Sequence, residues 1–434
     1  MTGISIERID RAIAAIDREV ATAVDAVLHD ARFQELEAAW RGLAYVASRV
    51  DPTENVEMVV WSYSQEELAE DFGAESDVTR TRFFRTVYTA EYGQHGGKPY
   101  GAMFANWSAS PAPAEVELLG RLASVAAMAH APLLLAASPE LLGAKSFGDL
   151  QAMTHPEGAF EGPGSERWTA FRKSEDSRYV GILLPRLLLR LPYTAMNLGG
   201  GGADRFVYDE RALRAGDMLW GSPIFAFAVR MAGSFARFRS SSAIVGPGDP
   251  PPVLDSHPAL GPSHVKPPVE VMLSRRLERS LSELGFIGLA WDPVATTLSF
   301  PTASSVQLPQ RYGSTEGGAA ATLSHLLGTR LPHLLLACRF AHYLKVLERE
   351  RIGSHREREE IEADLSAWIK QYVVVANNAP PETRLKYPLR DARVTVSEIA
   401  GSPGIHGLQV QLQPHVRYMR QAFTLSVDGR LEAR

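Results

Sequence analysis

Apolar residues near the N-terminus recur with the period of an α-helix. From Ile9 onwards they are spaced three or four residues apart, with charged residues between them. This spacing predicts one narrow apolar stripe along an amphipathic helix. The stripe consists of Ile9, Ile13, Ile16, Val20, Val24 and Val27. It can dock on the chain's own core or on a helix of a partner, and periodicity by itself favours the chain's own core.

Helix and strand patterns alternate over most of the remaining chain. The patterns predict helices from Phe33 to Gly42 or the Ser48–Pro52 region, and over Glu115–Ala129, Trp220–Phe238, Glu270–Leu284, Arg330–Ile352 and His355–Val373. They predict strands over Val56–Trp61, Leu133–Ala137, Tyr179–Leu184 and Gly285–Trp291. This alternation predicts a mixed α/β core.

The C-terminal region has the period of β-strands. Three stretches alternate apolar and polar residues, namely Arg393–Ile399, Leu408–Leu412 and Ala422–Val427. They predict a small antiparallel sheet. So small a sheet is marginally stable alone and leaves open edges, so we expect it to pair with a strand of another chain.

These patterns divide the chain into three parts. Residues 1–32 form an N-terminal helical arm, 33–385 an α/β core, and 386–434 the C-terminal strands. Within the core, residues 246–268 contain eight prolines. Because proline removes backbone donors and breaks helices, this stretch is expected to be a surface connection.

Composition indicates a soluble, cytoplasmic protein. The 434 residues carry a net charge of −5, which gives no overall attraction to nucleic acid or to an anionic membrane. The single cysteine, Cys338, excludes an intrachain disulfide and fits a reducing compartment. The N-terminus has no secretory signal, and the longest apolar stretches, Ala126–Ala137 and Val180–Leu191, are too short or too interrupted to cross a bilayer.

Two glycine-rich segments look superficially like phosphate loops. In Gly93–Pro99 the leading glycine is out of register, and Pro99 stands where a magnesium-binding Ser or Thr is required. The run Gly199–Gly202 lacks the spaced glycines that bring a pyrophosphate to a helix N-terminus. Both are interpreted as turns or loops, and no cofactor is expected.

Other catalytic patterns also fail their chemical requirements. The twelve histidines form no HExxH pair, and no zinc spacing occurs. A Ser263-x-x-Lys266 spacing lies in the proline-rich stretch, with no helix to present both side chains. Glu175 and Asp176 are adjacent on one backbone, flanked by cations, which favours an ion-pair network over a pair of catalytic acids. We therefore expect no catalytic or metal site and no enzyme activity.

Several blocks resemble the large subunit of the type VI secretion contractile sheath, the TssC/VipB/ImpC family, which is itself similar to phage tail sheath proteins. The blocks that carry this resemblance are Phe33–Leu43, Glu91–Gly101, Ala129–Pro139, Phe171–Gly181, Leu184–Tyr193, Arg339–Lys345 and Lys386–Val394. They follow the family's order from about Phe33 to Val396. The resemblance implies a phage-tail-sheath-like fold.

The resemblance also implies a set of partners. These are a small sheath subunit (TssB/VipA-like), further copies of the chain in a helical lattice, an inner tube of hexameric (Hcp-like) rings, and a baseplate. Strands exchanged between neighbours knit such lattices, by addition to open sheet edges. Our candidates for these contacts are Val394, Val396, Val410, Leu412, Phe423 and Leu425.

Two further expectations concern the tube and recycling. The acidic helix residues Glu357, Glu359, Glu360 and Glu362 are candidates for facing the tube, although a charged helix is usually a solvated face. In some family members a longer N-terminal extension recruits an AAA+ unfoldase. This chain starts almost at the amphipathic helix, so recycling by that route is doubtful.

The alternatives to a type VI sheath subunit are a sheath of another phage-like contractile system, or an α/β enzyme with an unrecognised site.

Overall fold

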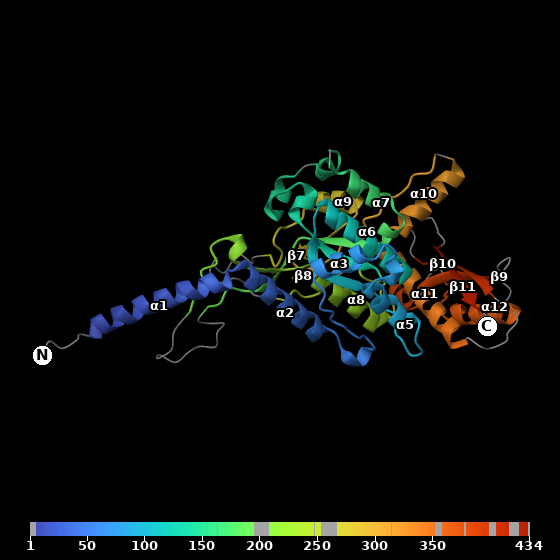
Figure 1. Ribbon diagram of the computed structural model, residues 1–434, viewed down its shortest axis with the longest axis horizontal. Helices are drawn as coiled ribbons and strands as arrows, with labels where there is room; N and C mark the ends of the chain where they lie inside the picture. The colour runs from blue at the N-terminus through green and yellow to red at the C-terminus, as the bar shows by residue number, and fades with distance from the viewer. Residues whose placement is uncertain are drawn as a thin grey trace.

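A computed structural model gives the fold of the chain (Figure 1). It describes residues 6–153, 155–162, 164–194, 208–246, 248–252, 267–313, 315–351, 358–376, 379–398, 405–415 and 425–432. The glycine run at 199–202, the Ser263–Lys266 spacing, Glu357 and Phe423 lie outside these ranges.

A four-stranded parallel sheet forms the centre of the molecule. Its order is β1-β2-β3-β6, with β1 at Met103–Ala109, β2 at Leu133–Ala137, β3 at Val180–Leu184 and β6 at Phe286–Gly288. Strands β2 and β3 are buried along their whole length, as expected of parallel strands covered on both faces.

Helices cover both faces of this sheet (Figure 1). Alternate residues of β2 point to opposite sides, so Leu133 and Leu135 join one hydrophobic core and Leu134 joins another. The first core includes α3 (Gln65–Ala74), α6 (Pro113–Met128), α7 (Glu166–Lys173) and α9 (Arg275–Glu283), and the second includes α2 (Ala31–Arg49), α8 (Ile224–Phe238) and α11 (Leu331–Arg351). The predicted α/β core is therefore confirmed as three layers.

Smaller elements complete the core. Two antiparallel ribbons pair β4 (Leu187–Arg190) with β5 (Leu219–Gly221), and β7 (Ala290–Asp292) with β8 (Thr297–Ser299). The short helices are α4 (Arg82–Phe84), α5 (Ala90–Tyr92), α10 (Glu316–Gly328) and α13 (Pro381–Lys386).

The C-terminal strands form a separate three-stranded antiparallel sheet, as predicted. Its order is β11-β10-β9, with β9 at Leu389–Glu398, β10 at Ile405–Pro414 and β11 at Leu425–Glu432. It packs on α11 and on α12 (Arg358–Lys370) around a third hydrophobic core. The C-terminal unit therefore includes two helices besides the predicted strands.

The N-terminal helix α1 (Ile6–Leu28) leaves the body as an arm (Figure 1). It is followed at Asp30 by α2, whose N-terminus this aspartate caps by accepting from the backbone N–H groups of Arg32 and Phe33. The tip of the arm and the C-terminal sheet lie at opposite ends of the long axis of the molecule.

Two sequence predictions are corrected here. Residues Val56–Trp61 form no strand, and Met58, Val59 and Val60 are exposed. Trp61 is held by an edge-to-face contact with Tyr100, at 4.8 Å between ring centroids, in place of strand pairing. The predicted helix at Trp220 begins only at Ile224, because Trp220 pairs with Leu188 in the β4–β5 ribbon.

Candidate partner-binding surfaces

The apolar stripe of α1 faces solvent. Seven residues at alternating spacings of three and four form it, and all seven are exposed: Ile6, Ile9, Ile13, Ile16, Val20, Ala23 and Val27. We call this set the arm seam. Of the residues predicted for this stripe, Val24 lies off the seam and is half-buried, one turn before the buried Leu28. A soluble chain rarely exposes a regular apolar stripe on an isolated helix, so the seam has the form of a docking surface.

A buried ionic network fixes the root of the arm to the body. Arg190, on β4, donates from Nε to Glu37 of α2 at 2.9 Å and from Nη1 to Glu210 at 2.5 Å. The side chain of Arg190 is 6% exposed and that of Glu210 is 1% exposed. His29, between α1 and α2, lies 3.1 Å from the other oxygen of Glu210. The network therefore ties both helices to the core.

Further contacts hold the last turn of α1. Asp25 accepts hydrogen bonds from the Tyr208 hydroxyl and, at 3.4 Å, from the backbone N–H of Arg211. Burial, followed by this hydrogen bond to Asp25, raises the pKa of Tyr208. The arm thus has a defined direction at its base, while its seam stays exposed.

Sequence reasoning missed a second exposed apolar face, on α2. Phe33, Leu36 and Trp40 are all exposed, and Trp40 is 67% exposed. The opposite face of α2 packs into the core through Tyr45 and Val46. A tryptophan exposed to this degree is typical of the centre of a protein–protein interface. The signal was present in the sequence, because Phe33, Leu36 and Trp40 are spaced as neighbours on one helix face.

The C-terminal sheet buries four of the side chains that we predicted for strand exchange. Val394, Val396, Val410 and Leu412 are each 4% exposed or less, and they pack within the chain's own core. Strand β10 is central, so its backbone pairs with β9 and β11 on its two sides. Leu425 pairs with Leu412 in the β10–β11 register. A partner strand would therefore meet the backbone of an edge strand, not these side chains.

The two edges of this sheet differ. The outer edge of β9 is engaged at both ends: the backbone N–H of Val396 donates to the Glu362 carboxylate at 3.0 Å, and Val374 N–H donates to the Leu389 carbonyl at 2.9 Å. Within the ranges that the structure covers, no strand pairs with the outer edge of β11. Among the described residues, the open edge is thus on β11.

The acidic residues predicted to face the tube fall into different environments. Glu359 and Glu360 are exposed in the first turn of α12, where Arg358 pairs with Glu359 at 2.6 Å. Glu362 is half-buried and bonded to β9, as described above. Of the three that the structure describes, Glu359 and Glu360 are the two whose side chains are exposed at the surface.

Buried titratable groups whose pKa values are strongly shifted, among them His342 and His130, lie in packing contacts inside the fold. His342 donates through Nε2 to the Ala129 carbonyl at 3.1 Å, and Tyr92 donates to the same oxygen at 2.6 Å. Burial lowers the pKa of His342 to about 3 and that of the neighbouring His130 to about 4. His342 and Tyr92 thus satisfy the Ala129 carbonyl at the end of α6, and His130 lies 3.4 Å from the Tyr179 hydroxyl, so all three have structural roles.

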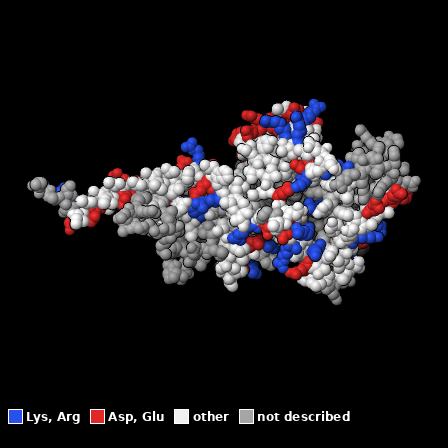
Figure 2. Space-filling view, turned by 90° about the horizontal axis from the view of Figure 1, so that it is seen from below, with Lys and Arg blue, Asp and Glu red and all other residues white. Residues whose placement is uncertain are grey.

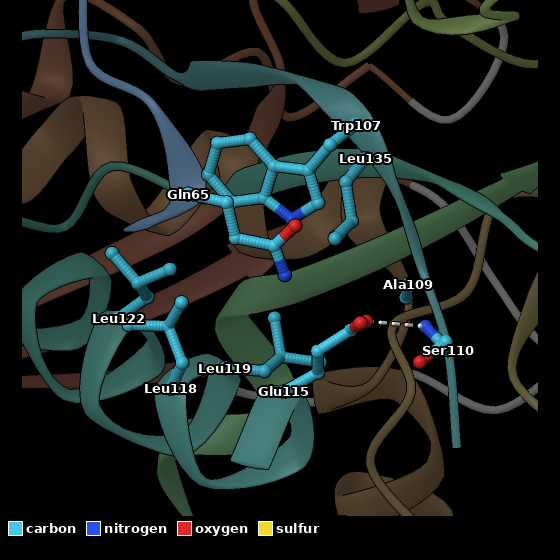
Figure 3. A pocket seen from close by; sticks show the side chains of 9 residues that line it. All are labelled: Gln65, Trp107, Ala109, Ser110, Glu115, Leu118, Leu119, Leu122 and Leu135. Carbon is cyan, nitrogen blue, oxygen red and sulfur yellow. Dashed lines mark hydrogen bonds between the residues drawn. The ribbon is translucent and has the colours of Figure 1, made fainter. Parts of the chain in front are cut away.

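One shallow groove lies between β1 and α6 (Figure 3). Its lining is Gln65, Trp107, Ala109, Ser110, Glu115, Leu118, Leu119, Leu122 and Leu135. The carboxylate of Glu115 accepts from the Ser110 backbone N–H at 3.1 Å (Figure 3). Glu115 is the one ionisable group in this lining, so the groove has no acid–base pair.

The other candidate chemical sites are structural. Gly93–Pro99 forms a turn in which Lys98 pairs with Glu57. Asp176 accepts from the Ser124 hydroxyl at 2.6 Å, and Glu175 pairs with Arg178. Among the residues placed in the structure, no group of His, Cys, Asp or Glu could hold a metal ion, and no helix is long and apolar enough to span a membrane.

Charge is dispersed over the body of the molecule. On the face drawn in Figure 2, basic and acidic side chains are interspersed rather than gathered into one basic field. This face does not have the electrostatic footprint of a nucleic-acid-binding surface.

Comparison with known proteins identifies the family. Residues 10–307 match the VipB family model, the N-terminal domain of the EvpB/VC_A0108 tail sheath, and residues 320–431 match its gpW/gp25-like domain. The type VI secretion system sheath protein TssC1 of Pseudomonas aeruginosa PAO1 is 34% identical over 433 residues, which cover 98% of this chain and 85% of that protein. The chain therefore belongs to the VipB family of type VI secretion tail sheath proteins and is a structural sheath subunit, not an enzyme.

Proposed function

We propose that this chain is the large subunit of a cytoplasmic contractile sheath, which pairs with a small sheath subunit and encloses an inner tube of hexameric rings. Contraction of the sheath on its baseplate would then drive the tube outward. The observation that carries the pairing is the arm seam. Seven apolar residues stand exposed on a helix whose root is fixed by a buried ionic network.

The geometry supports helix docking on the arm. A seam with alternating spacings of three and four suits knobs-into-holes packing against one or two other helices. Burial of such exposed apolar area against a partner stabilises the complex by about 25 cal/mol of free energy per Å² removed from water. The small sheath subunit would therefore gain its main hydrophobic contact on α1, with Trp40 on α2 as a second anchor.

The C-terminal sheet supports a second contact. A strand from a neighbouring subunit adds to an open edge by forming main-chain hydrogen bonds. We place this addition on β11, because Glu362 and Val374 already engage the outer edge of β9. Strand exchange at β11 and helix docking at α1 would then link each copy to different neighbours.

Co-purification with the small sheath subunit tests this pairing. The double variant Ile13→Asp/Ile16→Asp places two charges in the seam, and we expect the small subunit to be lost from the purified complex. Arg11→Asp/Arg18→Asp changes two exposed residues on the other side of the same helix and should retain it. Retention of the small subunit by the seam variant would exclude the arm as its binding surface.

A further inference from the structure

The charges beside the arm seam are all acidic. In heptad notation, Ile6, Ile13, Val20 and Val27 occupy a positions, and Ile9, Ile16 and Ala23 occupy d positions. The flanking e and g positions then hold the carboxylates of Asp10, Asp17 and Glu19 and no Lys or Arg.

The basic residues of α1 lie elsewhere on the helix. Arg8, Arg11 and Arg18 fall at c and f positions, away from the seam. Acidic side chains are visible along the arm in Figure 2. The helix is therefore divided into an apolar seam with acidic margins and an outer side that carries the cations.

Charges at e and g positions determine which helices pair in coiled coils. A helix with Lys or Arg at its own margins would form attractive pairs across this seam. A second copy of the arm would add three more carboxylates beside the same seam without any cation. This repulsion weakens pairing of two arms. It favours a basic helix over a second arm even though it adds nothing to the binding of the basic helix.

We propose that the arm selects a helix with an apolar heptad seam and basic margins, which belongs to the small sheath subunit, and that its acidic margins disfavour pairing of two copies of this chain. This inference rests on the proposed pairing with the small sheath subunit. It specifies the charge that the partner helix must carry. It also explains why two copies of this chain would not pair through their arm seams in the absence of the small subunit.

Two synthetic peptides provide the direct test. Both have four heptads with the same Ile and Leu seam, but one carries Lys at every e and g position and the other carries Glu. Like charges keep each peptide from pairing with itself. Binding to the full chain is measured by fluorescence anisotropy at low and at high salt.

We expect the Lys peptide to bind at least about tenfold more tightly than the Glu peptide at low salt, because three marginal pairs change from repulsive to attractive. High salt should reduce this ratio. In Asp10→Lys/Asp17→Lys/Glu19→Lys the preference should reverse. The control Glu7→Lys/Glu70→Lys/Glu117→Lys makes the same change in net charge away from the seam and should keep the original preference.

The outcomes separate this inference from the proposed pairing. Equal binding of the two peptides, tighter binding of the Glu peptide, or no binding of the Lys peptide would overturn charge selection. If the Ile13→Asp/Ile16→Asp variant still loses the small subunit in those cases, pairing through the arm stands without charge selection. If that variant retains the small subunit, the pairing itself fails.

Discussion

At the scale of single residues, buried charges fix the arm to the body. Arg190 pairs with Glu37 and Glu210 together, and neither Arg190 nor Glu210 has appreciable access to water. Removing Arg190 leaves the buried carboxylate of Glu210 without its guanidinium partner, which costs more than the intact pair contributes.

Arg190→Ala should therefore lower the free energy of unfolding by about 3–5 kcal/mol. Chemical denaturation followed by circular dichroism measures this change. The matched variant Arg41→Ala removes a 40% exposed partner of the same Glu37 and should cost about 1 kcal/mol or less. Equal losses in the two variants would contradict the assigned role of Arg190.

The buried histidines make stability depend on pH. Burial depresses the pKa of His342 to about 3 and that of His130 to about 4, whereas in the unfolded chain they titrate near 6.5. Protons therefore bind the unfolded state first as the pH falls. Their contribution is complete above pH 6.5 and is lost progressively between 6.5 and the folded-state values, by about 1.4 kcal/mol per pH unit for each histidine.

His342→Gln should weaken this dependence while keeping a donor for the Ala129 carbonyl. Denaturation midpoints measured between pH 7 and pH 5 should fall less steeply in the variant than in the parent chain. His155→Gln, on an exposed side chain, serves as the control and should leave the slope unchanged. A parent chain with no loss of stability over this range would refute the assignment of neutral, buried imidazoles.

At the scale of elements, the difference between the two edges of the C-terminal sheet predicts a pattern of hydrogen exchange that can be measured without a substitution. The N–H of Val396 is held by Glu362, whereas the outer edge of β11 is open in the described chain. On assembly with the small subunit, hydrogen exchange should slow in Leu425–Glu432 and change little in Leu389–Glu398. Mass spectrometry of the two states measures this, and new protection confined to β9 would place strand addition on the other edge.

Periodicity predicted the elements whose structure is decided locally. The run Leu133–Ala137 is continuously apolar, which is typical of a strand buried on both faces, and it is a strand. The run Leu408–Leu412 alternates, which is typical of a strand buried on one face, and it is also a strand. Val56–Trp61 is also largely apolar but pairs with no strand among the described residues, and a pattern carries no information about pairing. At Val56–Trp61 the pattern therefore predicted neither the exposure of Met58, Val59 and Val60 nor the lack of strand pairing.

The candidate surfaces were predictable to different degrees. The apolar stripe on α1 follows from spacing. Only the structure shows that Val24 lies off it and that the stripe faces solvent, whereas periodicity had favoured docking on the chain's own core. The alternation around Val394 and Val410 indicates a buried face but not what buries it, and here it is the chain's own helices. Capping of β9 by Glu362 joins residues 34 positions apart and leaves no local sequence signal.

At the scale of the whole molecule, the two candidate contacts lie at opposite ends. The arm seam extends from one end of the long axis, and the C-terminal sheet forms the other (Figure 1). A subunit with two separate contacts can join neighbours on both sides, which a helical assembly requires. The exposed acidic start of α12 lies near β9, the strand at the other edge of this sheet from β11.

Charge reversal on α12 tests whether this helix meets the tube. Glu359→Lys/Glu360→Lys should leave the fold unchanged, because both side chains are exposed. It should abolish sheath assembly templated on tube while the small subunit remains bound. Normal tube-templated assembly by this variant would show that the acidic turn is only a solvated face.

Negative-stain microscopy of the chain co-expressed with its small sheath subunit tests the central claim most directly. The account predicts hollow tubules with a cogwheel cross-section, which disappear when either protein is omitted. A monomer whose state does not change in the presence of the small subunit would contradict it.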